Sequence, residues 1–84
     1  MVNWHRIIFR DFEEDEEVHE KLHLHHLTFE EVIQCFYNPF EVRKNKKFKD
    51  RFQLIGRTDS GRKLKVIFQL KPKNLVRIIT GWDL

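Results

Sequence analysis

The sequence is poor in cysteine, glycine and proline, and it has no long apolar run. Among its 84 residues there are one cysteine, three glycines and two prolines. The single Cys35 excludes an internal disulfide, and without a cysteine pair no structural zinc site is expected. No segment approaches the roughly 20 apolar residues of a membrane span, and the N-terminus lacks the apolar core of a secretion signal. We therefore expect a single cytoplasmic domain over residues 1–84, with no membrane partner.

Large apolar side chains are nevertheless plentiful. Hydrophobic residues make up 40% of the chain, and phenylalanine alone occurs eight times. A chain of this length buries roughly 60% of its unfolded surface, so large rings are an efficient way to fill a thin core. No repeat, linker or low-complexity segment interrupts the sequence, which predicts order through most of its length.

Charge is distributed unevenly. Residues 1–31 carry nine acidic side chains and three Lys or Arg, whereas residues 32–84 carry thirteen Lys or Arg and four acidic side chains. The formal charges of the two parts are therefore −6 and +9. A basic half points to a phosphate-bearing partner, RNA or DNA, because neutralising each phosphate also releases counterions. Alternatively, the two halves neutralise each other or are simply solvated faces.

The N-terminal half predicts a strand and two helices. Residues 4–10 are apolar and β-branched enough for a short strand. Residues 11–24 follow as a helix whose acids come early, as the helix dipole favours. A second helix opens at the N-cap Thr28, where Glu31 completes a capping box, and it ends before Pro39. Its predicted apolar face comprises Phe29, Val32, Ile33 and Phe36.

The C-terminal half predicts three strands, over residues 50–57, 62–70 and 75–80. A hairpin turn joins the first two, with Gly61 supplying a positive φ. Residues 41–50 are polar and mostly basic, which is typical of an exposed loop or a ragged strand start. The apolar positions that alternate onto one face are Leu64, Val66, Phe68 and Leu70, with Phe52 and Leu54 as neighbours, so the other face is free to gather positive charge.

The element order β-α-α-β-β-β predicts an α+β fold, a small antiparallel sheet with two helices packed on one face. A set of motifs also occurs in a characteristic order: His25, TFEE at 28–31, CFYNPF at 35–40, Arg51, IGRTDSGRKLKVIF at 55–68 and VRIIT at 76–80. In order and spacing these motifs resemble the BrnT-like toxins, members of the RelE/ParE toxin superfamily.

The resemblance implies a RelE-like fold and an endoribonuclease that cleaves messenger RNA without a metal or other cofactor. It also implies an antitoxin partner, typically a ribbon-helix-helix protein, within a type II toxin-antitoxin system. After VRIIT the family's pattern continues with Ala and Arg, whereas this chain has Gly81 and Trp82. This difference favours a second hypothesis, a nucleic-acid- or protein-binding module of the same fold that lacks catalysis.

Three arginines match the family's motif positions: Arg51, Arg77 and Arg62. In metal-independent cleavage the 2′-hydroxyl attacks the adjacent phosphate, and the protein must stabilise the charge that builds on the phosphoryl oxygens. A guanidinium group suits this task because it stays charged and can bond two oxygens at once. The alternative role for Arg77 is an ion pair with an acid of the first helix, such as Glu16 or Glu20.

Histidines offer a second set of candidates. His25 is a candidate general acid or base because histidine titrates near neutrality; its alternative role is to cap the turn between the helices. His19 and His23 are spaced to share one helix face, but no third ligand has supporting spacing, so no metal site is predicted.

The segment 44–49 combines basic and aromatic side chains. Lysines at four of its positions can contact phosphates while Phe48 stacks on a base, or the segment is a solvated loop; they are Lys44, Lys46, Lys47 and Lys49. Trp4 and Trp82 offer further stacking surfaces, or they close the core. Cys35 is expected to be an inert buried thiol.

Overall fold

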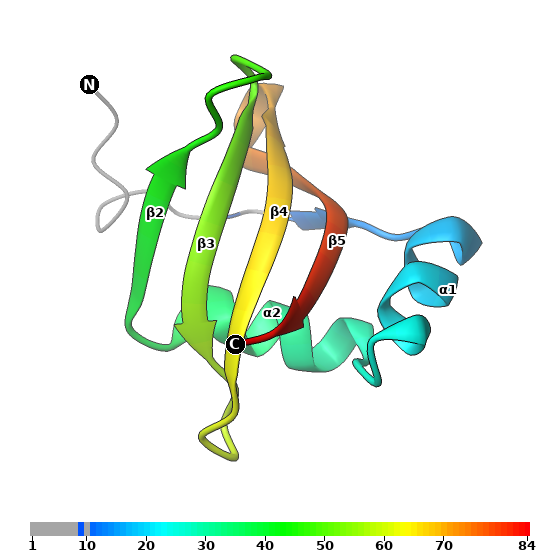
Figure 1. The fold of residues 1–84 in the computed structure, drawn as a ribbon. Coiled ribbons are helices and arrows are strands. Elements are labelled where there is room, and N and C mark those ends of the chain that lie inside the picture. Colours follow the sequence, from blue (N-terminus) through cyan, green and yellow to red (C-terminus); the bar gives the residue numbers. More distant parts are fainter. Residues whose placement is uncertain (1–8, 10) are drawn as a thin grey trace.

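The computed structural model describes residue 9 and residues 11–84 (Figure 1). Their elements are β1 (Asp11–Glu13), α1 (Glu16–Leu24), α2 (Phe29–Tyr37), β2 (Phe40–Lys44), β3 (Arg51–Arg57), β4 (Lys63–Lys71), the 3-10 turn η1 (Pro72–Asn74) and β5 (Leu75–Asp83). The α+β class and the two helices are confirmed. The strand predicted at 4–10 lies outside the described residues except for Phe9, which is buried. Neither α1 nor α2 is long and apolar enough to cross a bilayer.

The strands form one mixed sheet in the order β1-β5-β4-β3-β2. β2 to β5 pair antiparallel with their neighbours, whereas β1 runs parallel to β5, with Glu13 opposite Arg77. The prediction of a purely antiparallel sheet is therefore wrong at this edge. Residues 11–13 are extended rather than helical because Phe12 turns inward, where its ring packs edge-on against Phe36 at 5.1 Å between centroids.

The two helices begin at side-chain caps. α1 starts later than expected, since the Asp15 carboxylate accepts a hydrogen bond of 2.8 Å from the Val18 N–H and so fixes the first turn. α2 has the predicted capping box: the Glu31 N–H donates to Thr28 Oγ1 at 3.1 Å, and the Thr28 N–H donates to Glu31 Oε1 at 3.1 Å. Satisfying these N–H groups stabilises each helix at its first turn.

β2 covers the beginning of the segment 41–50, for which the sequence leaves open an exposed loop or a ragged strand start, and here the strand alternative is the correct one. Phe40 and Val42 alternate toward the core, where they pair in register with Gly56 and Leu54. The charged residues between and after them project from an edge strand, where charge discourages pairing with other chains. In the sequence these charged residues obscure the alternation of apolar and polar positions that is typical of a strand. Residues 45–50 form a loop, as expected.

α2 lies across one face of the sheet, and α1 lies beside β5 (Figure 1). The core fills the space between them, and the predicted alternation in β4 is confirmed: Leu64, Val66 and Phe68 are fully buried, and Leu70 packs at the margin. Gly56 allows the close approach of α2, because a Cβ at this position would lie 3.0 Å from the Cys35 carbonyl oxygen. Gly61 has a φ of +90°, as its turn requires.

Candidate nucleic-acid interface

The sheet face turned away from α2 carries most of the charged side chains of the strands. Strand alternation and register place on it the basic residues Arg43, Arg51, Arg57, Lys63, Lys65, Lys71 and Arg77, against the acidic residues Asp11, Glu13 and Glu41. We call these residues, with the uncharged strand residues between them, the basic face. One side of the sheet thus forms the core while the other presents an excess of positive charge to solvent.

Arg51, Gln69 and Arg77 form a row across three adjacent strands of the basic face. Arg51 of β3 lies opposite Gln69 of β4, which lies opposite Arg77 of β5. With strands about 4.8 Å apart, the two arginine backbones are roughly 10 Å apart. Both arginines line one pocket of about 170 Å³, together with residues of α1 and its N-cap that include Asp15, Glu17 and Lys21. The structure therefore brings two of the predicted site residues together.

Arg77 is only loosely paired. Its Nε lies 3.9 Å from Glu13 Oε2, and its side chain is 47% exposed. Its partner is thus the last residue of β1 rather than Glu16 or Glu20 of α1. Glu13 is also shared, since Lys71 Nζ lies 3.3 Å from each of its carboxylate oxygens. An anion that enters the pocket can therefore contact the Arg77 guanidinium without first breaking a short ion pair.

Arg51 is positioned by the loop that precedes β3. Its guanidinium carbon lies 4.2 Å from the Phe48 ring centroid, within the range of a cation–π contact. The loop is held by the Asn45 carboxamide oxygen, which accepts hydrogen bonds from the N–H groups of Lys47 and Phe48 at 2.8 and 3.2 Å. The four predicted lysines all lie in this region, with Lys44 ending β2 and Lys46, Lys47 and Lys49 in the exposed loop.

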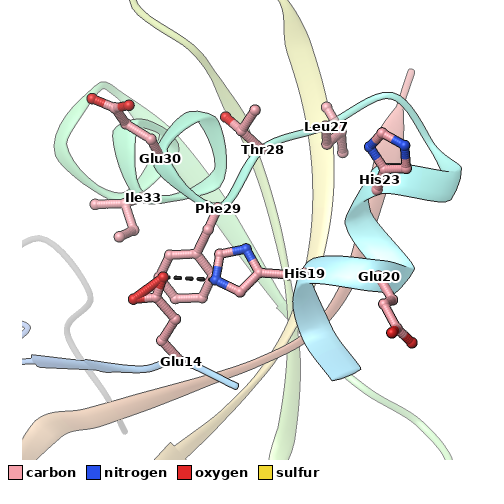
Figure 2. Close-up of a pocket in the computed structure, with 9 residues that line it drawn as sticks. All are labelled: Glu14, His19, Glu20, His23, Leu27, Thr28, Phe29, Glu30 and Ile33. Atoms are coloured by element: carbon pink, nitrogen blue, oxygen red, sulfur yellow. Dashed lines mark hydrogen bonds and ion pairs between the residues drawn. The ribbon is translucent and has the colours of Figure 1, made fainter. Parts of the chain in front are cut away.

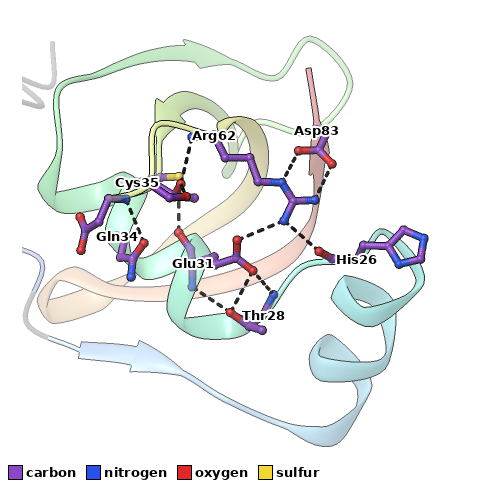
Figure 3. A network of polar contacts seen from close by, with 10 residues as sticks. His26, Thr28, Glu31, Gln34, Cys35, Arg62 and Asp83 are labelled. Carbon is purple, nitrogen blue, oxygen red and sulfur yellow. Dashed lines mark hydrogen bonds and ion pairs between the residues drawn. The ribbon is translucent and has the colours of Figure 1, made fainter.

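Arg62 occupies a different position, within a network of polar contacts (Figure 3). Its Nε and Nη2 donate to the two Asp83 carboxylate oxygens at 2.5 Å each. Its Nη1 donates to Glu31 Oε2 at 3.1 Å and to the His26 carbonyl at 2.9 Å. The hydrogen bond to Asp83 raises the pKa of Arg62, and the same bond lowers the pKa of Asp83. Arg62 thus ties the β3–β4 hairpin to α2 and to the end of β5, and it does not line the pocket of Arg51 and Arg77.

His25 is exposed at the end of α1 and does not line that pocket either. Its N–H donates to the Leu22 carbonyl at 3.0 Å, and its ring lies 6.3 Å from the Trp82 ring. Trp82 sits opposite Lys65, whose Nζ is 5.8 Å from the indole ring. Trp82 is therefore a partly exposed aromatic on the basic face, whereas Trp4 lies outside the described residues.

Sequence reasoning missed Gln69, Asp15 and Glu17 as neighbours of the two arginines. Gln69 becomes recognisable only once the register is known; its Nε2 donates to Asp50 Oδ2 at 2.5 Å. Asp15 carried a detectable signal, since an aspartate before an acidic first turn is a typical N-cap.

His19 of α1 is paired with a carboxylate. His19 Nε2 lies 2.7 Å from Glu14 Oε1. Within residue 9 and residues 11–84, no group of three or more His, Cys, Asp or Glu side chains is placed to hold a metal ion.

No family model and no curated protein sequence matches this chain. What the fold and the charge distribution define is a class: a small α+β protein whose mixed sheet is covered by helices on one face and is basic on the other.

Proposed function

We propose that the protein binds RNA on the basic face and cleaves it without a metal ion, as a BrnT-like toxin would. The observation that carries the proposal is the shared pocket of Arg51 and Arg77. Two guanidinium groups that line one small hollow can contact separate oxygens of a single phosphate. Gln69 lies between them and can donate a further hydrogen bond if its contact with Asp50 opens.

In the proposed reaction the 2′-hydroxyl attacks the adjacent phosphorus, and the bond from phosphorus to the 5′-oxygen breaks. The products are a 2′,3′-cyclic phosphate and a 5′-hydroxyl, so no water is consumed in this step. Arg51 and Arg77 stabilise the additional negative charge on the phosphoryl oxygens of the transition state. Because both guanidinium groups already line the pocket, the developing charge meets cations that are present before the reaction.

We assign proton transfer to one carboxylate of the pocket and to solvent. Glu17 lines the same pocket and can accept the proton of the 2′-hydroxyl, while solvent supplies the proton of the leaving oxygen. Glu17 is 3.2 Å from Lys21, which also lines the pocket. His25 would serve only if the RNA extended along β5 toward Trp82, since it lies outside the pocket.

RNA binding extends beyond the pocket on both sides. The basic loop offers cations and the exposed ring of Phe48, and Trp82 offers a second ring beside Lys65. Aromatic rings accept any base and lysines follow the backbone, so we expect binding that depends strongly on salt and weakly on sequence.

A second candidate function is a nucleic-acid-binding module without catalysis. It is favoured by Trp82, which stands where the family pattern has an arginine, and by the position of His25 outside the pocket. This module would bind RNA through the same face and release it unchanged.

The decisive experiment incubates the purified protein with a messenger-like RNA of several hundred nucleotides, with and without EDTA. We expect cleavage in both samples and products that end in a cyclic phosphate. Arg77→Ala should lower the rate roughly 10²–10³-fold, as removal of one charge-stabilising donor does in other enzymes. Arg43→Ala, which removes a basic-face arginine outside the pocket, is the matched control. RNA that stays intact at equimolar protein while binding persists would replace the enzyme proposal with the binding module.

The proposed partner in a toxin-antitoxin system is a ribbon-helix-helix antitoxin in the cytoplasm. An adjoining reading frame for such a protein, and growth arrest on expression that this protein relieves, would support the pairing. Expression without effect on growth would oppose it.

A further inference from the structure

A second and larger hollow lies on the other side of α1, away from the two arginines. It has a volume of about 690 Å³, within the roughly 300–1,000 Å³ range of ligand sites. Its floor is apolar, formed by Leu27, Phe29 and Ile33, and its sides come mainly from α1 and α2 (Figure 2). We call it the helix groove. It is independent of the basic face and of the RNA proposal.

The rim of the helix groove is acidic. Glu20 of α1 and Glu30 of α2 stand on opposite sides of the groove, and both are exposed (Figure 2). Glu14 also lines it and is held 2.7 Å from His19, whose ring centroid lies 5.4 Å from that of Phe29. No Lys or Arg is among the described residues that line this groove. A nucleic acid is therefore repelled here, whereas a cationic occupant is attracted.

The elements around the groove also select the backbone conformation of an occupant. None of the described residues that line the groove belongs to a strand, so its walls offer no sheet edge on which an extended peptide could pair. An occupant that satisfies its own backbone is an α-helix, whose apolar residues at i, i+3, i+4 and i+7 fit a groove between two helices.

We propose that the helix groove binds a cationic amphipathic helix of a partner protein, with its apolar stripe on Phe29 and Ile33 and its Lys or Arg side chains beside Glu20 and Glu30. The acidic N-terminal part of the chain then holds a basic protein segment, on a surface that is separate from the basic face.

The experiment uses the full chain and a short fluorescein-labelled Leu/Lys peptide, about four helical turns long, with leucines at helical spacing. Each of two control peptides keeps only one feature of the parent peptide. The first keeps the leucines and has Glu in place of every Lys, and the second keeps the lysines and has Ser in place of every Leu. Fluorescence anisotropy should show saturable binding of the Leu/Lys peptide, with both controls at least about tenfold weaker. Amide chemical-shift changes should map to α1 and α2 and not to β3 and β4.

Two charge-matched variants identify the surface. Glu20→Lys/Glu30→Lys should weaken binding of the Leu/Lys peptide on the order of tenfold or more, because two exposed attractions become repulsions. The control variant Glu16→Lys/Glu41→Lys makes the same change in net charge outside the groove. Each variant reverses one acid in the first turn of a helix, Glu30 in the first variant and Glu16 in the control, so their effects on helix stability are comparable. The control variant should stay within about threefold of the parent protein, since neither residue lines the groove.

Equal effects of the two variants, or shifts on the basic face, would overturn the proposal in favour of non-specific attraction. A molecular mass that doubles with protein concentration, and that Glu20→Lys/Glu30→Lys returns to the monomer, would overturn it in favour of a second copy as occupant. Circular dichroism of each variant checks that α1 and α2 remain folded.

Discussion

Replacing Gly56 with alanine probes the contact that sets the distance between α2 and the sheet. The new Cβ would lie 3.0 Å from the Cys35 carbonyl oxygen, 3.1 Å from Leu54 Cδ2 and 3.2 Å from Cys35 Cβ. All three separations are shorter than an ordinary van der Waals contact. The nearest atom belongs to the helix backbone, so it cannot move away unless α2 moves as a whole.

The expected decrease in stability follows from two opposing effects. Adding a methyl group to a well-packed core costs about 1–3 kcal/mol. Replacing glycine also restricts the unfolded chain, which returns about 0.4–1 kcal/mol. The net destabilisation is therefore roughly 1–2 kcal/mol, and at about 4–8 °C per kcal/mol for a domain of this size, Tm should fall by roughly 5–15 °C.

The measurement is thermal unfolding followed by circular dichroism, with Gly81→Ala as the matched control. A Cβ at Gly81 would lie 3.3 Å from the Lys65 carbonyl oxygen and 3.5 Å from Leu22 Cδ2, so small adjustments relieve it. Its Tm should stay within about 5 °C of the parent, since the smaller strain is offset by the same entropy. A Gly56→Ala protein as stable as the parent would refute the close packing of α2 on β3.

Three further predictions concern single features of the molecule. The first replaces the loop lysines Lys46, Lys47 and Lys49 with serine and measures the affinity for single-stranded RNA at several salt concentrations. The slope of log Kobs against log salt should become shallower by about 2, since each phosphate that is no longer neutralised accounts for about 0.7. An unchanged slope would exclude the loop from the interface. Because Arg62 lowers the pKa of Asp83 below its ordinary 3.8, the ionised carboxylate stabilises the fold above that pH and this stabilisation disappears as the pH falls further. Acid unfolding should therefore depend on pH more steeply below about pH 4 in the parent than in Asp83→Asn, and equal steepness would contradict the pairing. Burial raises the pKa of the Cys35 thiol to about 11, with smaller effects from Glu31 and Asp59. Iodoacetamide at about pH 8 should therefore alkylate Cys35 much faster in denaturant than in the folded protein. Equal alkylation rates, followed by mass spectrometry, would contradict the burial of this side chain.

The elements that the sequence predicts well are those whose signals are local. The capping box of Thr28 and Glu31 depends on residues three apart, and the turn at Gly61 depends on a conformation that glycine adopts readily. The alternation in β4 is equally local. Each of these features is decided within a few residues, so no tertiary information is needed to recognise it.

The elements that the sequence predicts poorly depend on distant partners. Residues 11–13 form a strand because β5 offers a parallel edge and α2 offers Phe36 as a neighbour for Phe12. β2 forms because Phe40 and Val42 find Gly56 and Leu54 across the strand pair. In both segments the charged residues outnumber the apolar ones, so the alternation is weak until the partners are known.

The candidate site shows the same division. The resemblance to the BrnT-like toxins selects Arg51 and Arg77, with Arg62 next, and the register places the first two in one row with Gln69. No local signal predicts the different role of Arg62, because that role depends on Asp83 and Glu31, which are both remote along the chain. Tertiary structure rather than the motif thus decides which guanidinium groups are tightly paired with carboxylates and which can contact a phosphate.

The shared pocket of Arg51 and Arg77 is tested most directly by a double-mutant cycle on RNA affinity. A short labelled single-stranded RNA is titrated at fixed salt with Arg51→Gln, Arg77→Gln and the double variant, with Arg43→Gln/Arg57→Gln as a charge-matched control. We expect each single change to weaken binding about tenfold or more, since a charge-assisted hydrogen bond contributes about 1.5–3 kcal/mol. The double variant should weaken binding clearly less than the product of the two single effects, because both groups hold one phosphate. Single effects that simply multiply, or that the control pair equals, would contradict a common phosphate site.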